Sequence, residues 1–254
     1  MHERILDGKC ALVSGGTRGL GAAISLELLR LGAYVIATYR DNVKAAEQFK
    51  LDHSEFVGQL TVRKCDVTCE SSYGELSNYV TDVYGKLDIL INNAGVNHRQ
   101  FMNETTPDSW DYIMDTNLKA PFFFTRHFWS LLKKGAPSRI INISSVAGQY
   151  FGPKTVHYAV SKTGLNGLTK VLARYGAPDS LYVNALAPGI IMTEQTEKEF
   201  QSGDAQRIIQ ETTLLKRPGT LQDVCSAIKF LTDPQQHYLT GQVINLSGGA
   251  ILNA

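Results

Sequence analysis

The sequence lacks an excess of charge of either sign. Its 25 lysines and arginines nearly balance 24 aspartates and glutamates, the formal net charge is +1, and the basic residues are not gathered into runs. Proteins that bind nucleic acid or anionic membranes through charge usually carry such basic clusters. We therefore expect no nucleic-acid partner and no membrane partner.

Long hydrophobic runs and paired cysteines are also missing. The opening residues, MHERILDGKCALV, place charges among their apolar positions, so we expect no signal peptide and no transmembrane span. The four cysteines form no CxxC pair, and neither they nor the histidines show the spacing of metal ligands. We expect reduced thiols, no bound metal and a cytoplasmic protein.

Short apolar segments rich in β-branched residues alternate with helical stretches along the chain. The strand candidates are CALVS, AYVIAT, LTVRKC, LDILIN, SRIINIS, LYVNALA and QVINL. They are apolar throughout, which is typical of a parallel sheet covered by helices on both faces. No linker, repeat or low-complexity segment divides the chain. This predicts a single α/β domain over residues 1–254, a doubly wound (Rossmann) fold of about seven parallel strands.

One polar segment interrupts this alternation. It covers residues 193–218, TEQTEKEFQSGDAQRIIQETTLLKRP. An insertion that covers a substrate site has this character, and so does an ordinary surface excursion. We interpret it as a substrate-covering segment.

A glycine-rich turn follows the first strand candidate. In SGGTRGLG, Gly15, Gly19 and Gly21 lead into a helical stretch. Glycines here allow a tight turn and the close approach of a pyrophosphate, which the free N–H groups of a helix start can bind. The order Gly-x-x-x-Gly-x-Gly differs from the usual Gly-x-Gly-x-x-Gly, and glycines also serve strand–helix packing. Its place between strand and helix favours a dinucleotide site.

The end of the second strand candidate indicates which dinucleotide. Tyr39 stands where NAD-binding proteins place an acidic residue for the ribose 2′-hydroxyl, and Arg40 follows it. With Arg18 from the glycine turn, two guanidinium groups would converge on one corner, which suits a 2′-phosphate. Asp41 is a competing signal, because a shift of one residue would make it a ribose ligand. We predict NADP(H).

Polar residues end two later strand candidates and lie on the helix after them. Asn92 and Asn93 end LDILINN, at the sheet edge where open parallel sheets bind ligands. In HYAVSK, Tyr158 and Lys162 form an (i, i+4) pair that projects from one helix face. Free tyrosine has a pKa of about 10, and a neighbouring cation favours its phenolate. Ser144 and Ser145 end the preceding strand, where either could simply cap the next segment. Tyr158 could exchange a proton with a carbonyl oxygen while Ser145 orients it.

These motifs together resemble the short-chain dehydrogenase/reductase family, most closely its 3-oxoacyl-[acyl-carrier-protein] reductases. The resemblance runs from SGGTRGLG, where Ser14 replaces the family's threonine, through NNAG to TGQVINLSGG. The Tyr-x-x-x-Lys pair matches, and so does a serine thirteen residues before the tyrosine, which selects Ser145 over Ser144. The resemblance implies a catalytic set of Asn117, Ser145, Tyr158 and Lys162, in which Asn117 holds a proton-relay water.

The same resemblance implies a set of cofactor-binding residues. Asp66 and Val67 should contact adenine, Asn93 the ribose region, and Ile191 with Thr193 the carboxamide and phosphates. The full set is Gly15, Thr17, Arg18, Gly19, Leu20, Gly21, Tyr39, Arg40, Asp66, Val67, Asn93, Ala94, Gly95, Tyr158, Lys162, Pro188, Gly189, Ile191 and Thr193.

The function implied is an NADPH-dependent ketoreductase that reduces a 3-oxoacyl thioester or another ketone to a secondary alcohol. The alternatives are an NAD(P)-dependent dehydrogenase oxidising a sugar, steroid or other secondary alcohol, and, less favoured, a non-catalytic NADP-binding sensor. The substrate would be a small molecule, possibly tethered to a carrier protein. Carrier-docking arginines expected near Ala136 and Asp179 are absent, which leaves open a different tethered ketone or a free one.

Family resemblance also implies a homotetramer or homodimer. Five aromatic residues on one predicted helix exceed what a single buried face needs, and core packing would account for about half of them. They are Phe122, Phe123, Phe124, Phe128 and Trp129.

Overall fold

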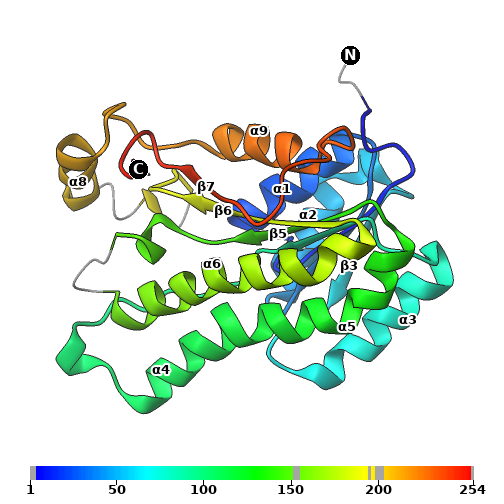
Figure 1. Cartoon of the computed structure of the whole chain (residues 1–254), viewed down its shortest axis with the longest axis horizontal. Coiled ribbons are helices and arrows are strands. Elements are labelled where there is room, and N and C mark those ends of the chain that lie inside the picture. Colours follow the sequence, from blue (N-terminus) through cyan, green and yellow to red (C-terminus); the bar gives the residue numbers. More distant parts are fainter. Residues whose placement is uncertain (1–3, 151–154, 194–195, 198–202, 253–254) are drawn as a thin grey trace.

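The computed structural model describes residues 4–150, 155–193, 196–197 and 203–252 (Figure 1). Within them, seven strands form one all-parallel sheet in the order β3-β2-β1-β4-β5-β6-β7. The strands are β1 (Cys10–Val13), β2 (Tyr34–Tyr39), β3 (Leu60–Lys64), β4 (Ile89–Asn92), β5 (Ser138–Ile143), β6 (Leu181–Pro188) and β7 (Val243–Leu246). The predicted doubly wound α/β fold is confirmed.

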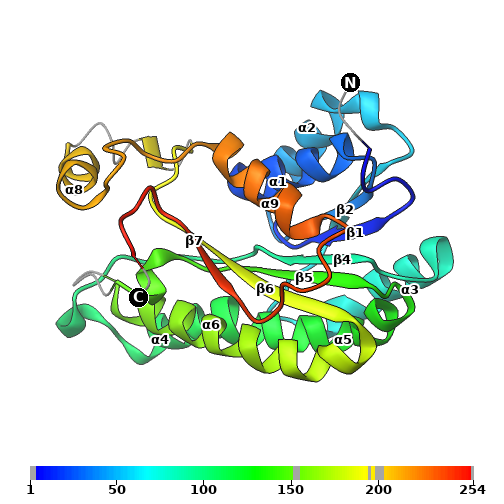
Figure 2. The same ribbon diagram turned by 45° about the horizontal axis from the view of Figure 1, so that its top comes forward.

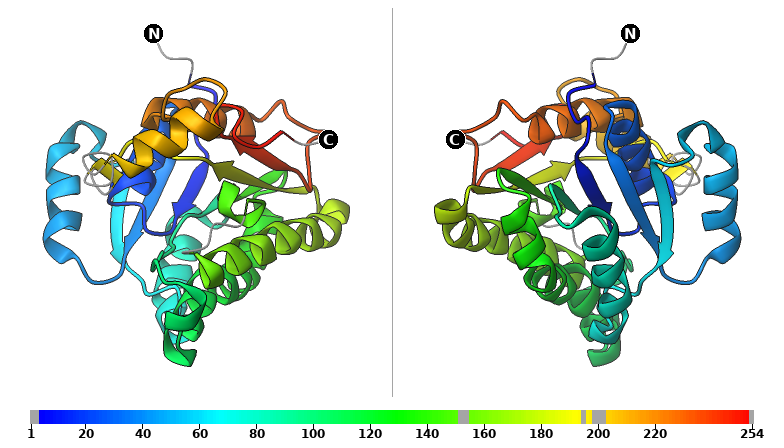
Figure 3. Two further views of the ribbon diagram at one scale, coloured as in Figure 1. Left: turned by 90° about the vertical axis from the view of Figure 1, so that its left-hand side faces the viewer. Right: turned by 90° about the vertical axis from the view of Figure 1, so that its right-hand side faces the viewer.

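Helices cover both faces of this sheet, as Figure 2 and the two side views in Figure 3 show. Helices α1 (Gly19–Arg30), α2 (Val43–Asp52) and α9 (Leu221–Thr232) lie on one face. The other face carries α3 (Tyr73–Tyr84), α4 (Pro107–Met114), α5 (Ala120–Lys134) and α6 (Val156–Gly176). Helix α8 (Asp204–Thr212) stands beyond the end of the sheet.

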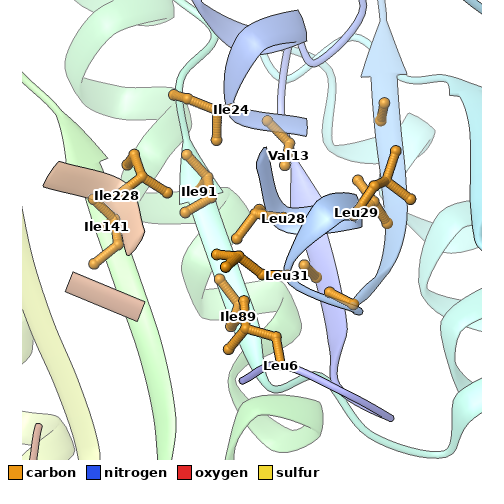
Figure 4. Packing of buried hydrophobic residues seen from close by; sticks show 14 of the residues in the cluster. Leu6, Val13, Ile24, Leu28, Leu29, Leu31, Ile89, Ile91, Ile141 and Ile228 are labelled. Atoms are coloured by element: carbon orange, nitrogen blue, oxygen red, sulfur yellow. The ribbon is translucent and has the colours of Figure 1, made fainter. Parts of the chain in front are cut away.

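Two hydrophobic cores result, one on each face. Successive side chains of a strand point to opposite faces, so Val13 of β1 joins one core and Leu12 joins the other. In the first core, Ile24 and Leu28 of α1 pack with Ile228 of α9 against the sheet (Figure 4). The central strands β1 and β4 are buried at every position, which explains their apolar runs, whereas β3 at the sheet edge ends with the exposed Arg63 and Lys64.

The aromatic residues of α5 divide between core and surface. Phe124 and Phe128 are buried, with ring centroids 4.9 Å apart, whereas Phe122 is 38% exposed. Packing within one chain thus accounts for part of the aromatic run, and association of copies through the exposed part stays a prediction.

The strand order reverses between β1 and β4, since β2 and β3 extend the sheet on one side of β1 and β4 to β7 extend it on the other. Open α/β sheets bind ligands at such a switch point, beyond the carboxyl ends of the strands. The glycine turn, the NNAG segment and Ser145 follow β1, β4 and β5 at this edge. Helix α8 lies beside the same edge (Figure 1), although residues 194–195 and 198–202 of the interpreted covering segment are outside the described residues.

A chain of buried polar side chains joins the elements that carry these loops. The Asn92 amide donates to Thr125 Oγ1 of α5 at 2.9 Å and to Asn142 Oδ1 of β5 at 2.8 Å. The Asn142 amide donates in turn to Thr169 Oγ1 of α6 at 2.9 Å. Asn92, which the sequence placed at a ligand-binding strand end, is therefore part of the scaffold and fixes β4 and β5 against their helices.

Replacing Asn142 with leucine should destabilise the protein, because the buried Asn92 amide and the buried Thr169 hydroxyl each lose one hydrogen bond. We expect the free energy of unfolding to fall by about 2–3 kcal/mol, measured by urea denaturation. The matched control is Asn103→Leu at an exposed position, where the change should stay within about 0.5 kcal/mol. Equal losses in the two variants would show that the buried chain of amides and hydroxyls adds nothing.

Candidate active site

Tyr158 and Lys162 lie one turn apart on α6, on the face toward the end of β5. The Lys162 ammonium is 5.7 Å from the centre of the Tyr158 ring and donates a hydrogen bond of 2.8 Å to the carbonyl of Ile143. The lysine is buried, with 5% of its surface exposed. The pair is thus held against the last residue of β5, which immediately precedes Ser144 and Ser145.

Burial shifts the pKa of both members of this pair toward the uncharged form. It lowers the pKa of Lys162 from 10.5 to about 8. It also raises the pKa of Tyr158, and a hydrogen bond with the Ser145 side chain opposes that rise. The site therefore contains a neutral phenol beside an amine that titrates near neutral pH.

The two serines after β5 have different partners. Ser144 is buried and its hydroxyl donates to Asn166 Oδ1 at 2.6 Å, so it ties β5 to α6. The Ser145 oxygen accepts a hydrogen bond from the Ala147 N–H at 3.1 Å, and its side chain also bonds with that of Tyr158. The structure thus brings Ser145, and not Ser144, to the phenol.

Asn117 lies in a π-helical turn, η4 (Asp115–Lys119), which joins α4 to α5. Turns of this kind often occur at functional sites. The Asn117 side chain is fully buried, accepts from the Val96 N–H at 2.8 Å, and donates to the Val96 carbonyl at 2.8 Å and to Ser161 Oγ at 3.2 Å. It connects the loop after β4 to the helix that carries Tyr158.

Gly95 brings that loop close to both polar groups. A Cβ added there would be 3.2 Å from Asn117 Oδ1 and 3.5 Å from Lys162 Nζ. The four predicted catalytic residues therefore come from the π-turn, the end of β5 and α6, and the structure gathers them at the carboxyl edge of the sheet.

The glycine turn is braced by side chains on both sides. Ser14 Oγ accepts from the N–H groups of Asn93 and Ala94, both at 3.0 Å. The Asn93 amide donates to the carbonyls of Ser14 and Gly15, at 2.9 and 3.1 Å. Asn93, predicted to contact the ribose, thus uses its amide N–H groups on the turn, and a ribose contact would have to come from its oxygens.

Close backbone contact explains the glycines themselves. A Cβ on Gly21 would lie 2.1 Å from the carbonyl oxygen of Gly15, a distance that no side chain tolerates. Gly15 has a φ of 61°, in the left-handed region that favours glycine. Helix α1 starts at Gly19, and the exposed side chain of Arg18 before it does not cap the helix. Thr17 is buried and Leu20 partly buried beside this helix start.

Arg40 and Asp41 form a pair at the end of β2. Arg40 Nε donates to Asp41 Oδ2 at 2.5 Å, and hydrogen bonding with Asp41 and with the Tyr112 phenol raises the pKa of the guanidinium. The two competing sequence signals are therefore partners. Tyr112 belongs to α4 and was not among the predicted residues, because nothing in the local sequence links it to β2.

The loop after β3 holds the residues predicted to contact adenine. Asp66 accepts from the N–H and the hydroxyl of Thr68, at 2.9 and 2.7 Å, so it shapes this loop. Val67 lines a small cavity of about 30 Å³ together with Tyr73 and Asp115 of the π-turn. Adenine recognition by these residues stays a prediction.

The segment after β6 completes the edge. Pro188 ends β6, and the Gly189 N–H donates to the Leu246 carbonyl of β7 at 2.9 Å. Ile191 is buried, and the Thr193 N–H donates to Thr196 Oγ1 at 2.8 Å. Ile190 packs against Ala205 and Ile209 of α8, and a cavity of about 140 Å³ is lined by residues of this segment and by Ile209.

Two kinds of feature are absent from the part of the chain that the structure describes. No group of three or more histidine, cysteine, aspartate or glutamate side chains there is arranged to hold a metal ion. None of the described helices is both long and apolar enough to traverse a bilayer.

Comparison with known proteins gives full-length matches. A family model described as Enoyl-(acyl carrier protein) reductase matches residues 15–250. An acetoacetyl-CoA reductase of Shinella zoogloeoides is 35% identical over 241 residues, which cover 95% of this chain and 98% of the relative. A 3-oxoacyl-[acyl-carrier-protein] reductase of Synechocystis is 33% identical over 248 residues, covering 97% and 98%.

Solved structures agree with these relatives. A putative short-chain alcohol dehydrogenase from Sinorhizobium meliloti has a TM-score of 0.89 and 30% identity, covering 96% of this chain and 97% of its own. ElxO with NADP bound gives the same TM-score and identity, covering 95% and 98%. The chain therefore belongs to the short-chain dehydrogenase/reductase family of oxidoreductases, and among them it is ketoreductase-like.

Proposed function

We propose that the protein is an NADPH-dependent ketoreductase, with Tyr158 as its proton donor. The observation that carries this proposal is the Tyr158 phenol, hydrogen-bonded to Ser145 and one helix turn from the buried Lys162 ammonium, at the switch point of the sheet. Relatives named acetoacetyl-CoA reductase and 3-oxoacyl-[acyl-carrier-protein] reductase support the direction of reduction.

The residues present fit a dinucleotide. The approach of Gly21 to the Gly15 carbonyl leaves a backbone cradle without side chains, and α1 begins there without a side-chain cap. Such a helix start binds pyrophosphate through its N–H groups. Arg40 would bind a 2′-phosphate, and the NADP-bound ElxO structure supports this choice of dinucleotide. When bound, the cofactor supplies the hydride.

Three side chains handle the substrate oxygen and its proton. The Ser145 oxygen accepts a hydrogen bond from the Ala147 N–H and its side chain bonds with the Tyr158 phenol, so a carbonyl oxygen placed beside both groups can accept from the Ser145 hydroxyl. The Tyr158 O–H donates its proton to the same oxygen as negative charge develops there. The Lys162 cation stabilises the phenolate that remains, and with a pKa of about 8 it can exchange protons near neutral pH.

Asn117 would serve the return of the proton to Tyr158. Its side chain is fixed to Val96 and to Ser161, and the Ser161 hydroxyl donates to the Tyr158 carbonyl at 2.7 Å. A rigid amide at this place can hold a water molecule that connects the buried lysine to solvent.

The surface near the expected carrier-docking positions supports a substrate without an acidic carrier. Asp179 forms an ion pair of 3.0 Å with Lys133, so a lysine that could have compensated for the missing arginines is neutralised. Ala136 precedes a cis-proline and offers no charge. We propose a coenzyme A thioester or a free ketone as the substrate.

Replacing Tyr158 with phenylalanine should remove the proton donor and keep the packing. We expect the kcat for ketone reduction to fall by about 10²–10⁴-fold. NADPH affinity, followed by fluorescence titration, should stay within about twofold, because the lost hydroxyl acts in the transition state and not in the binding of the cofactor. Ser145→Ala should also lower kcat, with Ser144→Ala as its matched control. Full turnover by Tyr158→Phe would remove this residue from the mechanism.

Replacing Arg40 with leucine tests the choice of dinucleotide. The loss of a charged hydrogen-bond donor to phosphate, about 1.5–3 kcal/mol, should weaken NADPH binding by roughly 10–100-fold. NADH affinity should be unchanged, since NADH lacks the 2′-phosphate. The control is Arg63→Leu on neighbouring β3, where the lost charge is the same. If Arg40→Leu lowers the affinities for NADPH and NADH equally, Arg40 does not bind the 2′-phosphate.

The lowered pKa of Lys162 predicts a pH dependence of stability. Between pH 8 and 10.5 the unfolded chain binds more protons at this residue than the folded one, so the free energy of unfolding rises with pH. Over this range wild type should gain roughly 3 kcal/mol relative to Lys162→Met, measured by urea denaturation at several pH values. Lys170→Met, at an exposed position of the same helix, should run parallel to wild type. If the free energy of unfolding of Lys162→Met changed with pH in parallel with wild type, the lowered pKa of Lys162 would be contradicted.

A further inference from the structure

The short turn that carries Ser145 is fixed to α6 on one side. This turn, η5 (Val146–Gly148), begins at Ser145, whose oxygen caps it. Gly148 packs directly on the helix, since a Cβ there would be 2.8 Å from the carbonyl carbon of Lys162. Thr163 Oγ1 donates to the Gly148 carbonyl at 2.9 Å. One end of the turn therefore cannot move without α6.

The other side of the turn is held by a reciprocal pair of amides. Gln149, the residue directly after η5, donates from Nε2 to Asn245 Oδ1 at 2.5 Å. Asn245 donates back from Nδ2 to Gln149 Oε1 at 3.2 Å. Both side chains are partly buried, and two antiparallel hydrogen bonds fix their mutual orientation as well as their distance.

Asn245 faces the turn because of the alternation of β7. Its neighbours Ile244 and Leu246 pack into the core on the α1 and α9 side, so Asn245 points to the opposite face, where η5 and α6 lie. Asparagine is disfavoured in strands, and at this position it makes a contact with Gln149.

The strand that carries Asn245 also reaches the segment after α8. Beyond β7, the Gly248 carbonyl accepts from the Leu215 N–H at 3.0 Å. A Cβ on Gly248 would be 2.9 Å from the Thr213 side chain, so the contact is close. Strand β7 is thus attached to the Ser145 turn through Asn245 and to the residues that follow α8 through Gly248.

We propose that Gln149 and Asn245 are positioning residues for Ser145, and that their amide pair sets the direction of its hydroxyl toward the substrate oxygen. This inference rests on the proposed ketoreductase function. The Ser145 side chain must meet the Ala147 N–H, the Tyr158 phenol and the substrate at once. A small rotation of η5 would break this combination, and a displacement of about 1 Å at a reacting group can reduce a rate by about a hundredfold.

The test replaces Gln149 with methionine, which has nearly the same shape and makes neither hydrogen bond. With NADPH and acetoacetyl-CoA as substrates, we expect kcat to fall by roughly 10–100-fold while NADPH affinity changes by less than about twofold. The exchanged pair Gln149→Asn with Asn245→Gln keeps one long and one short amide, and it should recover most of the lost activity. Failure of the exchanged pair to recover any activity would contradict the proposal.

The Ser145→Ala background separates positioning from a general structural effect. If Gln149 acts through Ser145, Gln149→Met should cause no further loss of kcat in Ser145→Ala. An equal loss in both backgrounds, or no loss in wild type, would overturn the inference. If Ser145→Ala itself had full activity, the proposed function would fail instead, so the two failures are distinguishable.

Should Gln149→Met not fold, Gln149→Glu provides the same measurement. The glutamate still accepts from Asn245 Nδ2 and cannot donate in return, so one of the two hydrogen bonds is lost at almost constant shape. We expect a smaller loss of kcat than for methionine, again absent in the Ser145→Ala background.

Discussion

The burial of one ammonium group is the constraint on which this site depends. A lysine enclosed between a sheet and a helix must find hydrogen-bond acceptors or lose its charge. Lys162 has one backbone acceptor, and its pKa is also lowered. Its bond to the Ile143 carbonyl ties α6 to the last residue of β5. Because Tyr158 is one turn away on that helix and Ser145 two residues beyond that carbonyl, the same contact sets the distance between phenol, amine and hydroxyl.

A second layer of polar contacts holds these elements where the lysine needs them. Asn92, Asn142 and their threonine partners connect β4 and β5 to α5 and α6 from within. Asn117 connects the loop after β4 to α6, because its side chain bonds both with backbone groups of Val96 and with the Ser161 hydroxyl. Amides perform this work because each offers a donor and an acceptor on a short, rigid stem. The site is thus rigid around Tyr158 and Lys162, and its more exposed parts lie toward the end of β2 and α8.

The sequence pattern predicted those features of the structure that depend on residues close together in the chain. The seven strands followed from apolar runs, the glycine turn from its place between strand and helix, and the facing of Tyr158 and Lys162 from helical spacing. The remaining features depend on residues far apart in the chain. The Gln149–Asn245 pair spans 96 positions, and the contact of Arg40 with Tyr112 joins β2 to α4. The sequence placed Asn92 at the ligand edge and gave no sign of the π-turn around Asn117, because strand pairing and helix packing decide both.

The crowding of Gly21 against Gly15 has a consequence for how this chain can evolve. Any side chain at Gly21 would force the backbone of the glycine turn to move, so this position tolerates almost no substitution. Arg40, Asp41 and Tyr112 are exposed side chains that can be exchanged one at a time. If the proposed coenzyme role of Arg40 holds, coenzyme preference can drift, or be redesigned, at the end of β2 while the glycine turn and the Tyr158–Lys162 pair are inherited unchanged.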